Sequence, residues 1–538
     1  MVRDLIKKII GIEDAVVDQP ENKNFGDYST GVVLRLAQKE GKNPVAMAGE
    51  IIDKIKAQPA SQNLFSKIEI AGPGFINFYL SPEFLQTQVV EILSAKEKYG
   101  ALNFGQGQKI QVEFISANPT GPLTLGNGRG GFYGDVLANV LEKAGFSVKR
   151  EYFVNDAGYQ VEILGHSYRK DEKAQYKGEY LENPILQSKT EGLNIIDTGA
   201  LVASYILETY IQPTIQGQMK IRFDEWVSEK AIRDSGLTDR VLGILKSKNF
   251  IYEQDGATWF KSTEFGDDKD RVLITSSKED REQSATYLLP DIAYHYKKFA
   301  EDKFDTVIDV WGADHHGYIA RLQAAGKALG IWDEKNLKIV IMQLVRLFSG
   351  GKEVKMSKRL GTYITLDELL EEIPLDVVRW FFLMRSPDTH MDFDMDLAKE
   401  QSDKNPVYYA QYAHARICAI LRKAEESGSP PLGGARGDVA SSHLITQSLN
   451  HSSELALIRQ LIRLPEIVED TARDYQVHRL PQYAMDLVRS FHKFYEDCRV
   501  IDETNEELTQ SRLALCEATR IVLKNTLDLM GINAPEKM

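Results

Sequence analysis

The chain has 538 residues, of which 43% are hydrophobic and 27% are charged, and its formal net charge is −13. This length predicts roughly three to five domains. No apolar run approaches the ~18 residues that a membrane-spanning helix requires, so we expect no membrane partner. The acidic balance argues against a protein that coats nucleic acid through Lys and Arg.

The first region, residues 1–105, has the pattern of an α+β domain. Apolar residues recur at helical spacing in residues 32–37 and 47–55. Two strands are predicted next, around residues 68–70 and at 75–80, on either side of a Gly-Pro-Gly turn at 72–74.

From Lys109 onward the pattern is that of a parallel sheet. A strand at 111–115, a loop rich in Gly and Pro, an apolar-faced helix through 132–144 and a strand at 148–154 make a βαβ unit. Strand-like runs at 306–311 and 337–342 supply further members. The fold class is therefore α/β. We predict a Rossmann-like domain over 106–345 with an insertion at about 165–235, then a connecting region at 346–404.

After residue 404 strand signals nearly vanish, and helices are predicted at 408–424, 455–472 and 481–500. This pattern predicts an α-helical bundle over residues 405–538. The three cysteines form no Cys-x-x-Cys pair, so we expect no zinc site. Sparse cysteine is typical of a reducing compartment, and we expect a cytoplasmic protein.

Two loops contain the residues that indicate phosphate binding. The first, residues 118–130, lies between a strand and a helix N-terminus, where exposed amides and the helix dipole favour an anion. The second is Lys355-Met-Ser-Lys358, whose two lysines suit a departing polyphosphate. Each alone has a plainer interpretation: a tight strand-to-helix connection for the first, and a solvated basic loop for the second.

Together the loops resemble the two signature loops of class I aminoacyl-tRNA synthetases. The wider sequence resembles arginyl-tRNA synthetases over the whole chain. The segments that carry the resemblance are residues 112–123, 151–158, 255–260, 266–272, 312–318, 405–416 and 531–538. The resemblance implies a ligase that uses ATP with Mg²⁺ to attach L-arginine to tRNA(Arg) through an arginyl-adenylate. It also implies a catalytic role for the Rossmann-like domain.

The first loop departs from the family, which normally has His-x-Gly-His where this chain has Thr124-Leu-Gly-Asn127. Thr and Asn can still donate hydrogen bonds to phosphates. An alternative is a catalytically degraded relative that binds tRNA without charging it. A second alternative is a nucleotidyltransferase that acts on a small molecule without tRNA.

The resemblance implies a role for each residue at matching positions. Catalytic roles fall on Thr124, Gly126, Asn127, Lys355 and Lys358. ATP-binding roles fall on Pro122, Leu125, Gly126, Gly128, Asp314, Met356 and Ser357. Asp314 follows a predicted strand end, where open α/β sheets bind ligands.

A guanidinium is planar and always charged, so a selective arginine pocket needs carboxylates and an aromatic wall. By resemblance the arginine-binding residues are Glu113, Ser116, Asn118, Tyr287, Asp291 and His315. Tyr287 and Asp291 are four apart and would share a helix face. The plainer interpretation of Asp291 is a helix-surface or N-cap carboxylate. His315 and His316 would point to opposite faces if they lay on a strand, which argues against a metal site.

The two flanking domains would contact tRNA. The first resembles the family's elbow-binding domain, and Phe75 and Asn77 could stack on a base and read its edge; an ordinary strand is the alternative. The last resembles the anticodon-binding bundle, with Tyr408, Tyr412 and Arg416 as candidates. These domains carry net charges of only −1 and −3, leaving −9 in residues 109–404. We expect a monomer.

Overall fold

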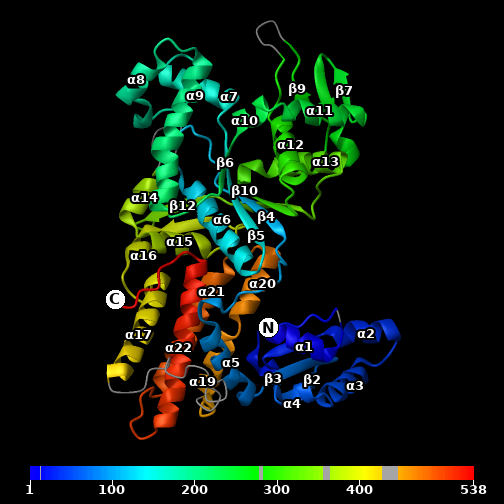
Figure 1. Ribbon diagram of the computed structural model, residues 1–538, viewed down its shortest axis with the longest axis vertical. Helices are drawn as coiled ribbons and strands as arrows, with labels where there is room; N and C mark the ends of the chain where they lie inside the picture. Colours follow the sequence, from blue (N-terminus) through cyan, green and yellow to red (C-terminus); the bar gives the residue numbers. More distant parts are fainter. Residues whose placement is uncertain (13, 278–282, 355–363, 427–445) are drawn as a thin grey trace. The chain divides into compact units, whose positions relative to one another are not determined.

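The computed structural model describes the chain apart from residues 13, 278–282, 355–363 and 427–445. The described residues form two compact units. The first consists of Met1–Leu102, Ser402–Arg473 and Arg479–Met538, and the second of Asn103–Gln401 and Asp474–His478. Figure 1 colours the chain from blue to red along its length. No described helix is both long and apolar enough to cross a membrane.

The second unit is built on a five-stranded sheet in which all neighbours are parallel. Its strand order is β11-β10-β4-β5-β6. The strands are β4 (Lys109–Glu113), β5 (Ser147–Val154), β6 (Glu225–Ser228), β10 (Thr306–Gly312) and β11 (Leu337–Met342). The predicted α/β fold with a Rossmann-like parallel sheet is therefore confirmed.

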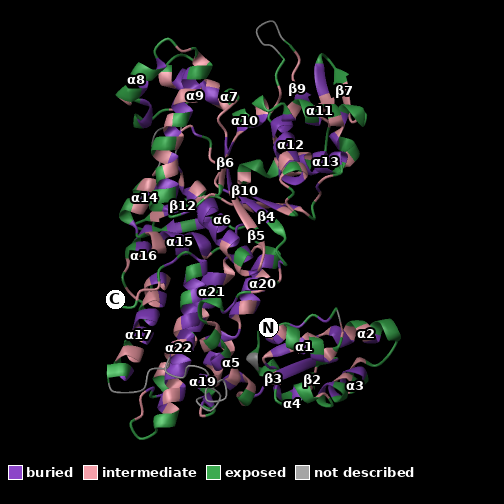
Figure 2. Cartoon of the chain, in the orientation of Figure 1, coloured by how far each residue is buried: buried purple, intermediate pink, exposed green. Residues whose placement is uncertain are grey.

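Helices pack on this sheet, and Figure 2 shows buried residues along α6 and α12. The unit's helices are α6 (Leu125–Lys143), α7 (Tyr159–Arg169), α8 (Pro184–Thr190), α9 (Ile195–Ile206), α10 (Glu229–Asp234), α11 (Leu237–Ser247), α12 (Leu288–Tyr296), α13 (Ile319–Leu329), α14 (Leu366–Glu372), α15 (Leu375–Leu383) and α16 (Met395–Lys399). Its π-helical turns are Leu207–Ile211, Pro213–Gln218 and Lys297–Glu301.

Two small sheets complete this unit. One is antiparallel and consists of β7 (Ile251–Gln254), β8 (Ala257–Phe260) and β9 (Arg271–Ile274). The other is mixed and consists of β12 (Val345–Ser349), β13 (Lys352–Val354) and β14 (Met391–Asp394).

Two predicted boundaries in this unit are wrong. The first strand ends at Glu113 instead of residue 115, because Ile115 and Ser116 take positive φ angles of 67° and 36°. These angles lie in the left-handed region, which a strand cannot accommodate. The predicted insertion over 165–235 also contains β6, a member of the main sheet. With four residues, β6 is too short to show a periodicity.

The first unit begins with an α+β arrangement, as predicted. Its three-stranded antiparallel sheet has the order β1-β3-β2. The elements are α1 (Val2–Ile10), β1 (Tyr28–Thr30), α2 (Val32–Glu40), α3 (Pro44–Lys56), α4 (Pro59–Gln62), β2 (Phe65–Ala71), β3 (Phe75–Leu80) and α5 (Pro82–Ala95).

The C-terminal part of the chain is helical, as predicted. Its described helices are α17 (Pro406–Glu426), α19 (Ser452–Leu461), α20 (Leu464–Asp474), α21 (Arg479–Asp497) and α22 (Glu506–Leu529). The single helix predicted over 455–472 is wrong, because the chain turns at Ile462 and starts again at Leu464. Pro465 lacks the amide that would continue the helical ladder, so it favours a new first turn here.

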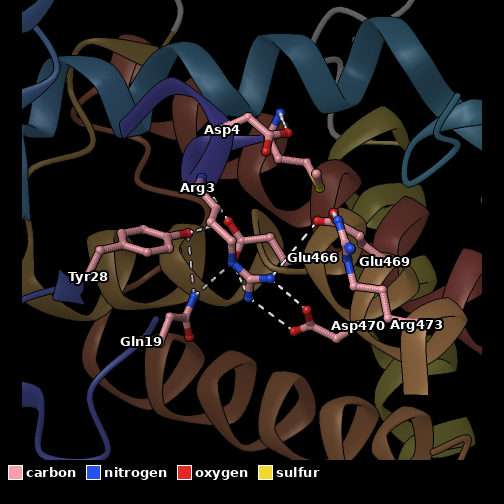
Figure 3. A network of polar contacts seen from close by, with 9 residues as sticks. Arg3, Asp4, Gln19, Tyr28, Glu466, Glu469, Asp470 and Arg473 are labelled. Atoms are coloured by element: carbon pink, nitrogen blue, oxygen red, sulfur yellow. Dashed lines mark hydrogen bonds and ion pairs between the residues drawn. The ribbon is translucent and has the colours of Figure 1, made fainter. Parts of the chain in front are cut away.

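The first unit is tied together by a buried polar network (Figure 3). The Arg3 guanidinium of α1 donates two hydrogen bonds to Asp470 of α20, at 2.6 and 3.0 Å. The Arg3 backbone amide donates to Glu466 (3.1 Å), which also accepts from the Tyr28 hydroxyl (2.9 Å). Burial raises the pKa of Glu466, while the nearby carboxylates raise the pKa of Arg3. Residues more than 400 positions apart are therefore held by charge-assisted hydrogen bonds.

Candidate active site

Helix α6 begins with a hydrogen-bonded cap between Thr124 and Asn127. The Thr124 backbone amide and hydroxyl both donate to the Asn127 side-chain oxygen, at 2.9 and 2.7 Å. The Asn127 amide donates to Thr124 Oγ1 at 3.4 Å, which completes a capping box. In the described chain the side chain of Asn127 takes part in this cap through its Oδ1 atom. Its Nδ2 group is a donor of the kind that phosphate oxygens accept.

The glycines that follow serve different purposes. Gly126 is exposed, and a Cβ placed on it would meet only Thr124 Oγ1, at 3.8 Å. Gly128 is buried, and a Cβ there would lie 2.7 Å from the Leu366 side chain of α14. Leu125 is also buried, and Pro122 is partly exposed. Gly126 is therefore open to a ligand, whereas Gly128 permits close packing of α6 on α14.

The second motif falls where the chain is not described: Lys355, Met356, Ser357 and Lys358 lie outside the described residues. The segment that follows it reaches the first loop. Thr365 forms a bridge with Thr124, and the Leu366 amide donates to the Leu123 carbonyl at 2.9 Å. Positions 241 residues apart in the sequence are thereby joined.

All six residues predicted to bind arginine line one cavity of about 310 Å³ at the C-terminal ends of β4, β5 and β10. They are Glu113, Ser116, Asn118, Tyr287, Asp291 and His315. Ligands of open parallel sheets bind at this edge. The cavity is also lined by Ile115, Phe153, Asn155, Ala157, Gln160, Glu229, Tyr294, His295, Val310, Trp311, Gly312 and Tyr318.

Asp291 lies in the first turn of α12 and is partly exposed to this cavity. Its amide donates to the carbonyl of Tyr287, which places the two residues on adjacent turns of one face (3.3 Å). Among the described residues, no cationic side chain lies within ion-pair distance of Asp291. Burial, reinforced by the carboxylates of Glu229 and Glu113, raises the pKa of Asp291 to about 8.

Glu113, the last residue of β4, is held at both carboxylate oxygens. Oε1 accepts from the Ser116 hydroxyl (2.9 Å), and Oε2 accepts from Lys298 Nζ (2.6 Å). The Phe153 amide of β5 donates to Ser116 Oγ at 3.1 Å, so the positive-φ turn after β4 is fixed to the next strand. A ligand at Glu113 would therefore meet an oriented carboxylate rather than a free one.

Asp314 follows the end of β10, as predicted, and lies with His315 and His316 in a 3₁₀ helix over Ala313–Tyr318, so the argument from a strand does not apply to the two histidines. Gly312 is the last strand residue, and the chain turns immediately after it. Asp314 is exposed and does not line the cavity, although His315 Nε2 lies 3.6 Å from its carboxylate. No three His, Cys, Asp or Glu side chains in the described chain are grouped as metal ligands would be.

Family comparisons cover most of the chain. Residues 1–80 match the arginyl tRNA synthetase N terminal domain. Residues 88–189 and 203–379 match the catalytic domain of tRNA synthetases class I (R). Residues 410–538 match the DALR anticodon binding domain. The chain belongs to the arginyl-tRNA synthetase family.

Relatives of known function align with this chain over nearly the full length of both sequences. The arginine–tRNA ligase of Bacillus subtilis is 44% identical, over 98% of this chain and 95% of its own. That of Anoxybacillus flavithermus is 43% identical, over 100% and 97%. The Thermus thermophilus arginyl-tRNA synthetase structure superposes with a TM-score of 0.75 at 23% identity and covers 100% of both chains, which shows a shared fold.

In this family member the N-terminal candidates for tRNA contact line a second cavity, of about 650 Å³, within the first unit. Phe75 is 40% exposed, whereas Asn77 is 2% exposed. The Ser29 hydroxyl donates to Asn77 Oδ1 (2.8 Å), and the Asn77 Nδ2 group is buried without a partner in the described chain. Phe75 therefore presents an aromatic face, whereas the unpaired amide donor of Asn77 is buried.

On α17 the C-terminal candidates are arranged unequally. The rings of Tyr408 and Tyr412 stack with centroids 6.4 Å apart, and Tyr412 is 43% exposed. The Arg416 guanidinium lies over the ring of Tyr495, 4.3 Å from its centroid. Tyr412 is therefore available to a partner, while Arg416 is engaged within the bundle.

Sequence reasoning missed several cavity residues of this synthetase. Glu229, the first residue of α10, is buried and accepts from Arg233 at 2.6 Å. It lies in the stretch that we predicted as an insertion, so nothing marked it as part of the site. Lys298, which does not line the cavity but forms an ion pair with Glu113, was missed as well, because it is one of two adjacent lysines and only the structure shows which of them is buried.

Proposed function

We propose that this chain is an arginine–tRNA ligase that supplies arginyl-tRNA for protein synthesis. The observation that carries the proposal is Asp291, a carboxylate with no ion-pair partner among the described residues, in the same small cavity as Glu229 and Tyr287. A guanidinium would provide the missing cation and five donors for these acceptors. Membership of the arginyl-tRNA synthetase family supports the use of ATP and of tRNA(Arg) as the other two substrates.

The reaction has two steps. An oxygen of the arginine carboxylate attacks the α-phosphorus of ATP, the bond to the bridging oxygen breaks, and pyrophosphate leaves. A ribose hydroxyl of the terminal tRNA adenosine then attacks the activated carbonyl, and AMP leaves. No side chain becomes covalently linked, so the protein's contribution is positioning and charge stabilisation. Mg²⁺ bound to ATP would neutralise part of the phosphate charge.

For arginine, we assign Asp291 and Glu229 to the guanidinium and Tyr287 to the wall beside it. Glu113 is the last residue of β4, whereas Glu229 and Asp291 belong to α10 and α12. We assign it, with the nearby Ser116 and Asn118, to the α-amino group, and we assign His315 to the lining of the arginine site. This division places two carboxylates at the guanidinium end of the substrate and one at the α-amino end.

For ATP, we assign the α6 N-terminus with Thr124, Gly126 and Asn127 to the phosphates, and Asp314 to the ribose. Pro122 would contact the nucleotide from the preceding loop. Lys355 and Lys358 would act on the departing pyrophosphate, with Met356 and Ser357 beside the adenosine. Leu125 and Gly128, both buried, would support this loop by packing rather than by contact.

For tRNA, we propose that residues 1–105 read the elbow through Phe75 and Asn77. Residues 405–538 would read the anticodon, with Tyr408, Tyr412 and Arg416 near that surface. Residues 106–345 would form the catalytic domain and 346–404 the connecting region. We further propose that the protein acts as a monomer in the cytoplasm.

Charging of a tRNA(Arg) transcript with radiolabelled arginine by the purified chain tests the proposal directly. We expect charging that needs both ATP and tRNA and that other amino acids do not support. Retention of tRNA binding without charging would instead identify a degraded relative. Exchange of pyrophosphate into ATP on another carboxylic acid without tRNA would identify a small-molecule nucleotidyltransferase.

A further inference from the structure

Four acidic residues lie side by side across the parallel sheet. Strand register pairs Asp309 with Glu113, Glu113 with Glu151, and Glu151 with Glu225. Residues paired in this way project to the same face of neighbouring strands, which are about 4.8 Å apart. The first three are 0%, 6% and 1% exposed. Buried like charges at this spacing repel one another unless a cation lies among them.

Two lysines form ion pairs with these four acidic residues, one at each end of the row. Lys149 forms an ion pair with Glu225 at the outer end and lies 4.0 Å from Glu151. Lys298 is fully buried and lies 2.6 Å from Glu113 Oε2 and 3.1 Å from Asp309 Oδ1. Its ammonium also lies 4.1 Å from the centroid of the Tyr294 ring. Lys298 therefore has its charge fully enclosed by groups that attract it.

From Lys298, two hydrogen-bonded chains reach the cavity. In one, Glu113 accepts from the Ser116 hydroxyl, and both residues line the cavity. In the other, Asp309 Oδ2 lies 2.8 Å from His295 Nε2. His295 lines the cavity, and its Nδ1 lies 2.8 Å from the carbonyl of Asp291. One buried ammonium thus sets the position of groups on both β4 and α12.

We propose that Lys298 is a positioning residue that fixes the spacing between the two cationic subsites of the arginine cavity and thereby determines selectivity for a doubly cationic amino acid. This inference rests on the arginine-binding function proposed above. Without the ammonium, Glu113 and Asp309 repel, and Glu113 is free to leave the orientation that Ser116 and Lys298 give it. The Glu113 carboxylate would then no longer lie at the distance from Asp291 that the two cationic ends of arginine require.

Two variants separate positioning from stability. Lys298→Met keeps a side chain of similar length but removes its charge, and it leaves the buried Glu113 and Asp309 carboxylates without their ammonium partner. Lys298→Met/Asp309→Asn removes the cation together with its distal carboxylate, and the new side-chain amide can still form a hydrogen bond with His295 Nε2. We expect the single variant to have a lower melting temperature and the double variant to recover most of that loss.

Binding of arginine is then compared by calorimetry with binding of citrulline, in which an uncharged ureido group replaces the guanidinium. Both measurements use the full-length chain. We expect both variants to bind arginine about tenfold more weakly or worse, as for loss of a charge-assisted contact. The ratio of the Kd for citrulline to the Kd for arginine should be smaller in both variants than in the wild-type chain. A purely structural role predicts that the double variant regains binding and selectivity along with its melting temperature.

Lys149→Met is the matched control, because Lys149 serves the same row but touches no residue that lines the cavity. It should bind arginine within about twofold of the wild-type chain. Wild-type selectivity in the double variant would overturn the inference and leave the proposed function standing. Failure of the wild-type chain to bind arginine would overturn the proposed function, and the inference with it.

Discussion

Thr124 and Asn127 hydrogen-bond to each other at the start of α6, so the two residues that stand in place of the family's histidines also form the helix cap. A phosphate bound at this N-terminus would therefore meet the Asn127 Nδ2 donor in an orientation that the cap fixes. The departure from the usual motif keeps both a helix cap and hydrogen-bonding groups, which agrees with an active enzyme.

Thr124→Ala should affect both stability and rate. Loss of the capping hydroxyl costs about 0.5–2 kcal/mol of unfolding free energy. The Thr124 hydroxyl also orients the Asn127 side chain, so its loss should weaken the hydrogen bond from Asn127 Nδ2 to a phosphate in the transition state and lower turnover by up to roughly 10²-fold. Denaturant unfolding and steady-state charging measure the two effects. Thr124→Ser keeps the hydroxyl and should retain both properties; equal turnover in the two variants would exclude a role for the hydroxyl in positioning Asn127.

Arginine binding should strengthen as the pH rises through about 8, the value to which burial raises the pKa of Asp291. Below that pH the carboxyl is largely protonated and cannot pair with a guanidinium, so binding must release a proton. Calorimetry in buffers of different ionisation enthalpy counts that proton. Asp291→Asn should bind weakly, without this pH dependence; an unchanged proton count would assign the titration to another group.

The same pKa shift predicts a stability effect of the opposite sign. The folded state binds a proton at Asp291 more tightly than the unfolded state, whose carboxyl has a pKa of about 3.9. This contribution to stability is present below pH 4 and is lost as the pH rises toward 8. Asp291→Asn should therefore raise the melting temperature at pH 8 without arginine. A variant that melts lower at pH 8 would show a structural role.

Gly199→Ala should destabilise the segment that packs α9 against α7. A Cβ at Gly199 would lie 1.9 Å from the Val161 carbonyl oxygen, which belongs to rigid backbone. We expect a loss of about 1–3 kcal/mol or more in unfolding free energy. Gly217→Ala is the control, because a Cβ there meets no atom within 4 Å. Similar stabilities for the two variants would contradict this close packing.

Phe75→Ala should weaken tRNA binding and leave arginine binding unchanged. Stacking of an aromatic side chain on a base contributes about 1–3 kcal/mol, so the Kd for tRNA should rise by roughly 5- to 150-fold. Filter binding measures it. Ile70→Ala on the neighbouring strand is matched in exposure, at 36%, but does not line the cavity. Equal effects of the two substitutions would argue against stacking at Phe75.

The parts of the fold predicted from sequence are those with a long local pattern. The apolar face of α6 and the paired strands around Gly72–Gly74 needed only neighbouring residues to be recognised. Six cavity residues were named by family resemblance. Glu229 and Lys298 were not, because their roles depend on which distant strand lies beside them. The pairing of Asp309 with Glu113, 196 residues away, is a property of sheet register that no local pattern contains.

The Arg3 network has a consequence for synthesis on the ribosome. Arg3 emerges first, but its partners Glu466 and Asp470 follow only after most of the chain has been made. At about 5–20 residues per second, the interval is roughly half a minute to a minute and a half. The second unit, encoded almost continuously by residues 103–401, has all but five of its residues before that. The order of translation therefore lets the catalytic sheet assemble while the N-terminal domain still awaits its docking helix.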